Sequence, residues 1–278
     1  MSNQSSSSKR ASIMDMFGEG PGTEEIYSLK EFLDLLRQEF DIKLDDSERL
    51  AKRKNLDINL DSEYINQHLD KLFETCLERA PAGSTSQLAN RKSELALKIL
   101  ESMAMNANEI DQFDQVRPNI VNLLNKSYFE KVTKLFQSNA DFVLKLARMI
   151  IDILGRALHN NLSVINPLLQ ILEYGFKNSS NQIKSQAYEC WKMLINNFAL
   201  DREFFLKAKK FSLILMPLLN KCKTYKDESV CKAKLLSWMC LIENLADQLP
   251  KYSYKVLIPF FNYSFGLNNL MIENGLYN

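Results

Sequence analysis

Apolar residues recur three or four positions apart along most of the chain, the spacing that places them on one face of a helix. The pattern predicts a first amphipathic helix over 24–41 and further helical segments over 64–77 and 88–103. From Gln112 onward the pattern becomes regular. It predicts helices at about 116–126, 128–137, 140–158, 162–177, 180–198, 203–222, 227–247 and 252–265. With only 8 Gly and 7 Pro, the chain has little material for hairpins, so we expect an all-α fold.

Four prolines mark a repeat in the second half of the chain. Each of them opens a similar short phrase, and the steps between them are 49, 50 and 42 residues; they are Pro118, Pro167, Pro217 and Pro259. Self-similarity at this period is typical of stacked helical repeats. The sequence therefore predicts a HEAT/armadillo-like superhelical repeat array, which presents a surface rather than an active site. Each proline should bend its helix, Pro217 more than Pro167, which lies near a first turn.

Composition divides the chain into three regions. Residues 1–23 are rich in Ser and Gly and are expected to form a disordered tail. Residues 24–126 hold the N-terminal helices, interrupted by a charged connection near 44–61. Residues 127–278 hold the repeats.

Two short motifs lie in the first region and in the charged connection. Arg10-Ala11-Ser12 matches a basophilic kinase site, which makes Ser12 a candidate phosphorylation site. Lys52-Arg53-Lys54 resembles a nuclear import signal. The alternatives are a random tripeptide and a solvated helix face.

The formal net charge of +1 hides an asymmetry between the two halves of the chain. Residues 1–130 carry 23 acidic and 16 basic side chains, a charge of −7, and residues 131–278 carry 11 and 19, a charge of +8. A basic half can attract polyanions. No run approaches the roughly 18 apolar residues of a membrane span, and no hydrophobic signal peptide opens the chain. We expect a soluble, intracellular protein that does not bind membranes.

Residues suited to catalysis are scarce. There are two histidines, His68 and His159, for which a structural or surface role is the stronger interpretation. Phosphate-loop, zinc-protease and nucleophile-elbow motifs are absent from the sequence. Five widely spaced cysteines, without a Cys-x-x-Cys pair, indicate free thiols and no zinc site: Cys76, Cys190, Cys222, Cys231 and Cys240. We therefore predict a protein without enzymatic activity, metal or cofactor.

The strongest positive signal is a cluster of lysines over 207–226, a stretch that contains no acidic residue. Six lie between positions 207 and 226, and they are the candidate DNA-binding residues: Lys207, Lys209, Lys210, Lys221, Lys223 and Lys226. Such a patch would meet DNA through phosphates, with little sequence preference. The alternative is a solvated face balanced by Asp227 and Glu228. Trp191 and Trp238 are interpreted as core anchors rather than base-stacking platforms.

Several segments of the repeat region resemble a known family. They are Val143-Leu-Lys-Leu with Leu154-Gly-Arg-Ala-Leu-His159, Ile165–Phe176, Trp191–Leu200 and Ala208–Leu218. Together, over about 128–265, they are similar to the N-terminal repeat domain of the Rap-one-interacting factor one family. The resemblance implies a nuclear, chromatin-bound, non-catalytic scaffold in telomere maintenance, replication timing and the response to double-strand breaks. Its implied partners are DNA or chromatin, with self-association.

The family also recruits protein phosphatase one through short motifs outside the repeat domain. Lys131-Val-Thr-Lys134 lacks the aromatic residue that such a motif needs, so phosphatase recruitment is not expected of this chain. Residues 266–278 scarcely supply a cap for the last repeat, which favours a truncated family member or a capping partner. A rival interpretation is a protein-binding adaptor whose concave groove takes up a peptide or a partner helix, without nucleic-acid contact.

Overall fold

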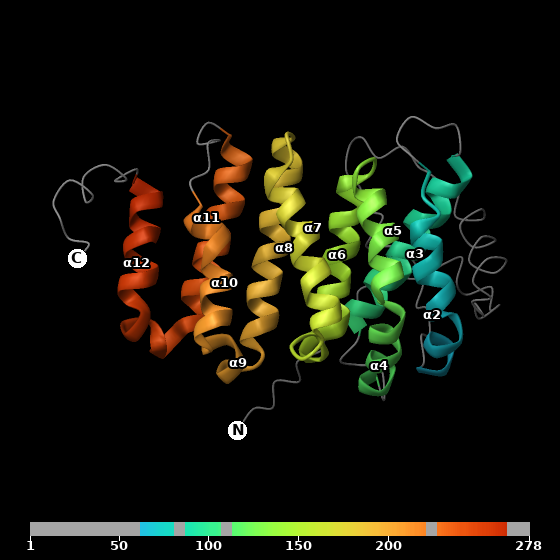
Figure 1. Ribbon diagram of the computed structural model, residues 1–278, viewed down its shortest axis with the longest axis horizontal. Coiled ribbons are helices and arrows are strands. Elements are labelled where there is room, and N and C mark those ends of the chain that lie inside the picture. The colour runs from blue at the N-terminus through green and yellow to red at the C-terminus, as the bar shows by residue number, and fades with distance from the viewer. Residues whose placement is uncertain (1–61, 81–86, 107–112, 221–226, 266–278) are drawn as a thin grey trace, which may run out of the picture. The chain divides into compact units, whose positions relative to one another are not determined.

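The computed structural model describes residues 62–80, 87–106, 113–220 and 227–265, and every regular element in these ranges is a helix (Figure 1). The predicted all-α fold is therefore confirmed. The chain divides into two compact units, Met1–Leu124 and Asn125–Asn278. Several predicted features lie outside the described residues: the tail with Ser12, the helix over 24–41, the connection near 44–61 and the basic run at 52–54.

The first unit contains α2 (Ser62–Leu77), α3 (Gln87–Asn106) and α4 (Phe113–Leu123). Helix α2 packs against both of the others, with Leu72 and Phe73 fully buried. Arg79, just after α2, forms a 2.6 Å ion pair with Glu94 of α3. The predicted helical segments over 64–77 and 88–103 are thus confirmed.

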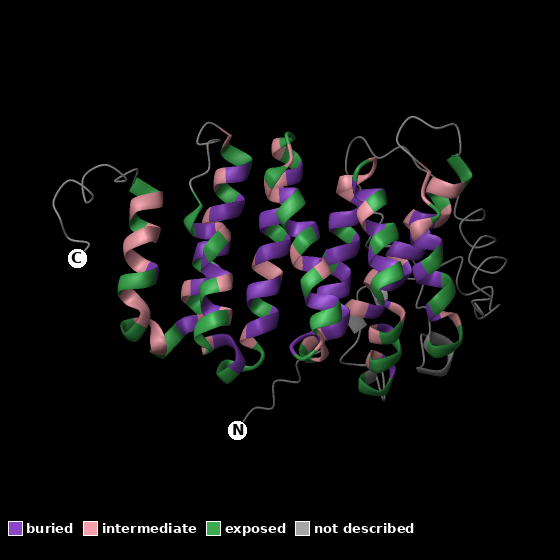
Figure 2. Ribbon diagram, viewed as in Figure 1, coloured by how far each residue is buried: buried purple, intermediate pink, exposed green. Residues whose placement is uncertain are grey.

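The second unit contains most of the described helices. They are α5 (Lys126–Phe136), α6 (Ala140–Leu154), α7 (Leu162–Lys177), α8 (Asn181–Ala199), α9 (Arg202–Leu206), α10 (Ala208–Leu219), α11 (Glu228–Leu245) and α12 (Leu249–Phe265). The long helices α6, α8 and α11 lie side by side with α8 in the middle, and α5, α7, α10 and α12 pack against them (Figure 1). Burial is extensive along α8, whereas α12 has a single buried residue, Val256 (Figure 2).

Hydrogen bonds between the neighbouring long helices recur at a regular sequence distance. Those from Cys190 Sγ to Leu144 O and from Asn197 Nδ2 to Ile151 O each span 46 residues, and that from Ser237 Oγ to Tyr188 O spans 49. Other hydrogen bonds between the same helices span 44 to 48 residues, so these distances are close to, and mostly a few residues shorter than, the 49- and 50-residue steps between the first three repeated prolines. The periodicity of the sequence is therefore present in the packing of α6, α8 and α11.

A buried polar cluster joins α8 to the end of α6. Asn197 Nδ2 donates to the carbonyl oxygens of Ile151 and Gly155, at 3.1 and 3.0 Å. His159 Nε2 lies 2.8 Å from the backbone oxygen of Asn197 and 3.2 Å from its Oδ1. Both of these oxygens are acceptors, so Nε2 carries the hydrogen. His159 is therefore a buried structural residue, as the sequence indicated.

Two predicted helices are shorter than expected because the backbone turns within them. The helix predicted over 140–158 ends at Leu154, where Gly155 adopts φ 50° and ψ −131°, and a 3₁₀ turn follows over Gly155–Leu158. This conformation strongly favours glycine. The helix predicted over 203–222 is broken at Lys207, whose ψ of 128° is not helical, into α9 and α10.

The four repeated prolines lie inside α4, α7, α10 and α12, as predicted. Pro167 is the sixth residue of α7 and Pro217 the tenth residue of α10, so Pro217 lies farther from a first turn, as expected. Its missing N–H leaves the carbonyl group of Leu213 without the usual intrahelical donor.

Both tryptophans are core residues, 3% and 0% exposed, which confirms the prediction for Trp191 and Trp238. Their hydrogen bonding differs. The indole N–H of Trp191 donates to Ile214 O of α10 at 3.1 Å, whereas that of Trp238 has no acceptor among the described residues. The helix facing Trp238 is α12, through Phe260, and it is therefore less completely docked than α10.

Candidate nucleic-acid interface

The first three candidate lysines lie around the break between α9 and α10. Lys207 is the single non-helical residue at the break, and Lys209 and Lys210 are in the first turn of α10. Lys207 and Lys209 are exposed, and Lys210 is half-buried. The other three candidates, Lys221, Lys223 and Lys226, lie outside the described residues.

The break has a local cause in the sequence around α9. Asp201 caps this five-residue helix by accepting a hydrogen bond from Phe204 N at 3.0 Å. Phe204 and Phe205 are both buried, which anchors α9 in the core. Lys207 then leaves the helical conformation, and α10 starts at Ala208. The lysines are thus held at a rigid corner rather than along one continuous helix.

An aromatic ring supports two of these lysines. The Phe204 ring stacks on buried His159, with 4.5 Å between ring centroids and an interplanar angle of 5°. Lys210 Nζ lies 4.9 Å and Lys207 Nζ 5.8 Å from the centroid of Phe204. Cation–π attraction favours these ammonium positions, so they are partly preorganised.

Packing of α12 adds a lysine that the sequence analysis missed. The ring of Phe211, in α10, lies 4.6 Å from that of Tyr252, in the first turn of α12. Lys251 is exposed, and its Nζ lies 5.6 Å from the Tyr252 centroid. We call Lys207, Lys209, Lys210 and Lys251 the lysine–aromatic edge. Lys251 is distant in sequence from the other three, and the Phe211–Tyr252 contact is the link between them.

Three carboxylates lie on the same segments, and two of them are already engaged. The hydrogen bond from Phe204 N–H lowers the pKa of Asp201, so this cap stays ionised near neutral pH. Asp247 pairs with Arg202 at the surface, so its charge is balanced by a neighbouring cation. Glu203 is exposed. Lys207 and Lys209 form no ion pair with any described residue, so they remain available to an anion.

The described cysteines are free thiols: Cys76, Cys190, Cys231 and Cys240. Burial raises the pKa of Cys190 to about 12 and that of Cys240 to about 11. Both thiols are therefore protonated at neutral pH and unsuited to nucleophilic chemistry. Cys222 lies outside the described residues. Among those residues, no group of three or more His, Cys, Asp or Glu side chains is placed to hold a metal.

Two further observations concern partners. Lys131–Lys134 lies within α5, with Val132 buried, so this segment is not an extended docking motif. None of the described helices is both long and apolar enough to span a bilayer.

Residues 64–252 match the family described as Rap1-interacting factor 1 N terminal, which is more than half of the chain. The chain belongs to this family. Two curated relatives are telomere-associated protein RIF1 of mouse, 32% identical over 154 residues, and of human, 34% identical over 148 residues. These matches cover 55% and 53% of this chain but only 6% of each relative. The chicken protein of the same name is 34% identical over 154 residues.

The Rap1-interacting factor 1 N-terminal match includes the second half of the first unit and most of the second. The lysine–aromatic edge lies within the matched residues, and so do α7, α8 and α10. No solved structure matches the chain. The family resemblance seen in the sequence is thus confirmed.

Proposed function

We propose that this chain is a non-enzymatic helical-repeat region that contacts DNA within a nuclear, telomere-associated chromatin protein. The repeats are of the HEAT/armadillo kind. In this proposal the chain serves telomere maintenance, replication timing and the response to double-strand breaks as a scaffold. Its partner is the phosphate backbone of DNA, bound at the lysine–aromatic edge.

Two observations support a stacked repeat array. Helices α6, α8 and α11 lie side by side, and the hydrogen bonds between them span 44 to 49 residues. Arrays of this kind bury one continuous core and present extended surfaces for binding. Nuclear and telomeric location rests on family membership and on the name of the relatives, telomere-associated protein RIF1.

One observation carries the proposed DNA contact. The lysine–aromatic edge places the ammonium groups of Lys207 and Lys210 on the buried ring of Phe204 and that of Lys251 on the half-buried ring of Tyr252, and the fourth lysine, Lys209, is exposed beside them. Each lysine that neutralises a phosphate releases a condensed counterion, which makes binding favourable and sensitive to salt. Phosphate contacts of this kind carry no sequence information, so the edge is expected to bind double-stranded DNA of any sequence.

The direct test is reversal of charge at the two exposed lysines. The double variant Lys207→Glu, Lys209→Glu is expected to weaken binding to a labelled DNA duplex at least about tenfold. It should also lower the slope of log affinity against log salt by roughly 2, one unit for each lost phosphate contact. Lys210 is left in place because it packs on Phe204 and Phe198, so the fold should be unchanged.

The matched control is Lys131→Glu, Lys134→Glu, which makes the same change in charge at two exposed lysines of α5. This variant should retain most of the affinity. Equal losses in the two variants would mean that overall charge, and not the edge, governs binding. Full DNA affinity in the Lys207→Glu, Lys209→Glu variant would rule out the edge, and absence of binding in the unmodified chain would favour the protein-binding adaptor.

A further inference from the structure

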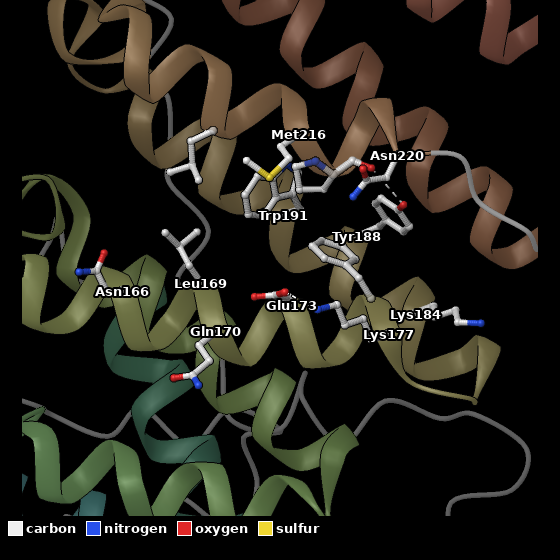
Figure 3. Close-up of a pocket in the computed structure, with 13 residues that line it drawn as sticks. Asn166, Leu169, Gln170, Glu173, Lys177, Lys184, Tyr188, Trp191, Met216 and Asn220 are labelled. Atoms are coloured by element: carbon white, nitrogen blue, oxygen red, sulfur yellow. Dashed lines mark hydrogen bonds and ion pairs between the residues drawn. The ribbon is translucent and has the colours of Figure 1, made fainter.

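A groove runs between α7 and α10, with α8 as its floor (Figure 3). Its volume is about 670 Å³. On α7 its lining extends from Asn166 to Lys177. At a rise of 1.5 Å per residue, this stretch corresponds to roughly 16 Å, or three turns of a helix. The groove uses the second half of α10 and is thus built from other residues than the lysine–aromatic edge.

The centre of the groove is aromatic and apolar. The Phe176 ring lies 4.8 Å from that of Tyr188 and 5.7 Å from that of Trp191, measured between centroids. The polar atoms of the two floor residues are engaged with α10: Trp191 N–H donates to Ile214 O, and Tyr188 OH donates to Pro217 O. Tyr188 and Trp191 are themselves buried, so the aromatic surface within reach of a ligand is that of the half-buried Phe176.

On the α10 side, the groove is lined by an exposed methionine. Met216 is 57% exposed and lies above the ring of Trp191, beside Pro217 (Figure 3). Flexible, polarisable methionines are common on surfaces that bind apolar partner helices. The exposed Met216 and the half-buried Phe176 and Leu213 together form a surface suited to bulky apolar side chains, above the buried aromatic floor.

One end of the groove is basic. Lys177 and Lys184 lie at this end, opposite Asn220 (Figure 3). Lys177 pairs with Glu173 at 2.5 Å, whereas Lys184 has no acidic partner among the described residues. A ligand that fills the groove therefore binds more tightly if it carries a negative charge at the end near Lys184. A negative charge at the apolar centre would not raise its affinity.

We propose that this groove binds an amphipathic α-helix of a partner protein, about three turns long. Apolar side chains at positions i, i+4 and i+7 of that helix pack on Phe176, Leu213 and Met216, which line the groove and are not buried, and an acidic side chain near one end pairs with Lys184. A helix fits better than an extended peptide. The groove is bounded by helices, whose backbone groups are bonded internally, so there is no strand edge to satisfy an extended backbone.

The test is selection from a displayed library of three-turn helical peptides, randomised on one face, against the whole chain. Selected peptides are then synthesised with a fluorescent label and titrated. We expect enriched sequences to share an apolar i, i+4, i+7 stripe with Asp or Glu near one end. Met216→Glu should weaken their binding at least about tenfold, and Lys184→Glu should weaken it about threefold or more.

The matched control is Met239→Glu on α11, because Met239 is also an exposed helical methionine, at 43%, and does not line the groove. Binding to this variant should change less than about twofold, as expected for a surface position outside the interface. No enrichment, or enriched peptides that bind Met216→Glu as well as the unmodified chain, would overturn the proposal. Circular dichroism of each variant confirms that the helices are intact. Because DNA titrations do not probe the groove, either proposal can fail while the other stands.

Discussion

Replacement of Asn197 by leucine is expected to destabilise the second unit by about 3 kcal/mol. The side chain of Asn197 is buried and donates to the carbonyl oxygens of Ile151 and Gly155, where α6 ends. Its Oδ1 also accepts from His159. Leucine has a similar volume but cannot form these hydrogen bonds, and each buried polar group that loses its partner costs about 1–3 kcal/mol.

Urea unfolding followed by tryptophan fluorescence measures this effect, because both tryptophans, Trp191 and Trp238, lie in the second unit. The control is the neighbouring Asn196→Leu. Asn196 is exposed, and its Oδ1 accepts from Cys240 and Asn244 at the surface of α8, so the loss should stay below about 1 kcal/mol. Similar losses in both variants would contradict the special role of the buried amide.

Gly175→Ala is the second substitution with a large expected effect. It should destabilise the second unit, although alanine is favoured over glycine within a helix. Alanine in place of glycine normally stabilises a helix by about 1 kcal/mol. At Gly175, however, an added Cβ would lie 2.7 Å from the Cβ of Ala187 in α8 and 3.5 Å from Leu144 in α6. Helices α7 and α8 would have to separate, and overpacking of this kind costs about 1–3 kcal/mol. We expect a net loss of up to about 2 kcal/mol in the same urea experiment.

A compensating variant tests whether the loss of stability in Gly175→Ala comes from the contact with Ala187. Ala187→Gly alone should cost about 1 kcal/mol, as glycine does within a helix. Combined with Gly175→Ala, it restores the space at the crossing. The double variant should therefore be more stable than the sum of the single losses predicts, by about 1 kcal/mol or more. Strict additivity, or a stabilising Gly175→Ala, would show that α7 and α8 are not closely packed at this point.

The positions of most helices follow from apolar periodicity alone. Apart from α12, the long helices of the second unit bury many apolar residues, so burial of residues such as Leu194 and Leu241 appears in the sequence as a 3.6-residue pattern. The steps between the prolines likewise indicated a repeat of about 50 residues, and hydrogen bonds between α6, α8 and α11 span similar distances of 44 to 49 residues. Both patterns recur many times along the chain, so they can be recognised from the sequence.

Features that depend on contacts between individual side chains could not be predicted from periodicity. The break at Lys207 depends on how α9 is anchored through Phe204 and Phe205, which are apolar residues like those inside any helix. Lys251 joins the lysine–aromatic edge because Tyr252 packs on Phe211. No regular sequence spacing predicts this contact. The groove between α7 and α10 likewise depends on the separation of two helices. The candidate sites therefore required the structure, whereas the fold class did not.

The most direct test of the proposed DNA contact is a fluorescence-anisotropy titration of the unmodified chain with a labelled DNA duplex at several salt concentrations. Each phosphate contact contributes about 0.9 to the slope of log affinity against log salt. With three or four contacts from the lysine–aromatic edge, we predict binding at about 50 mM salt and a slope of roughly −3. No binding at low salt, or an affinity that salt does not change, would contradict the proposal that this edge binds the phosphate backbone.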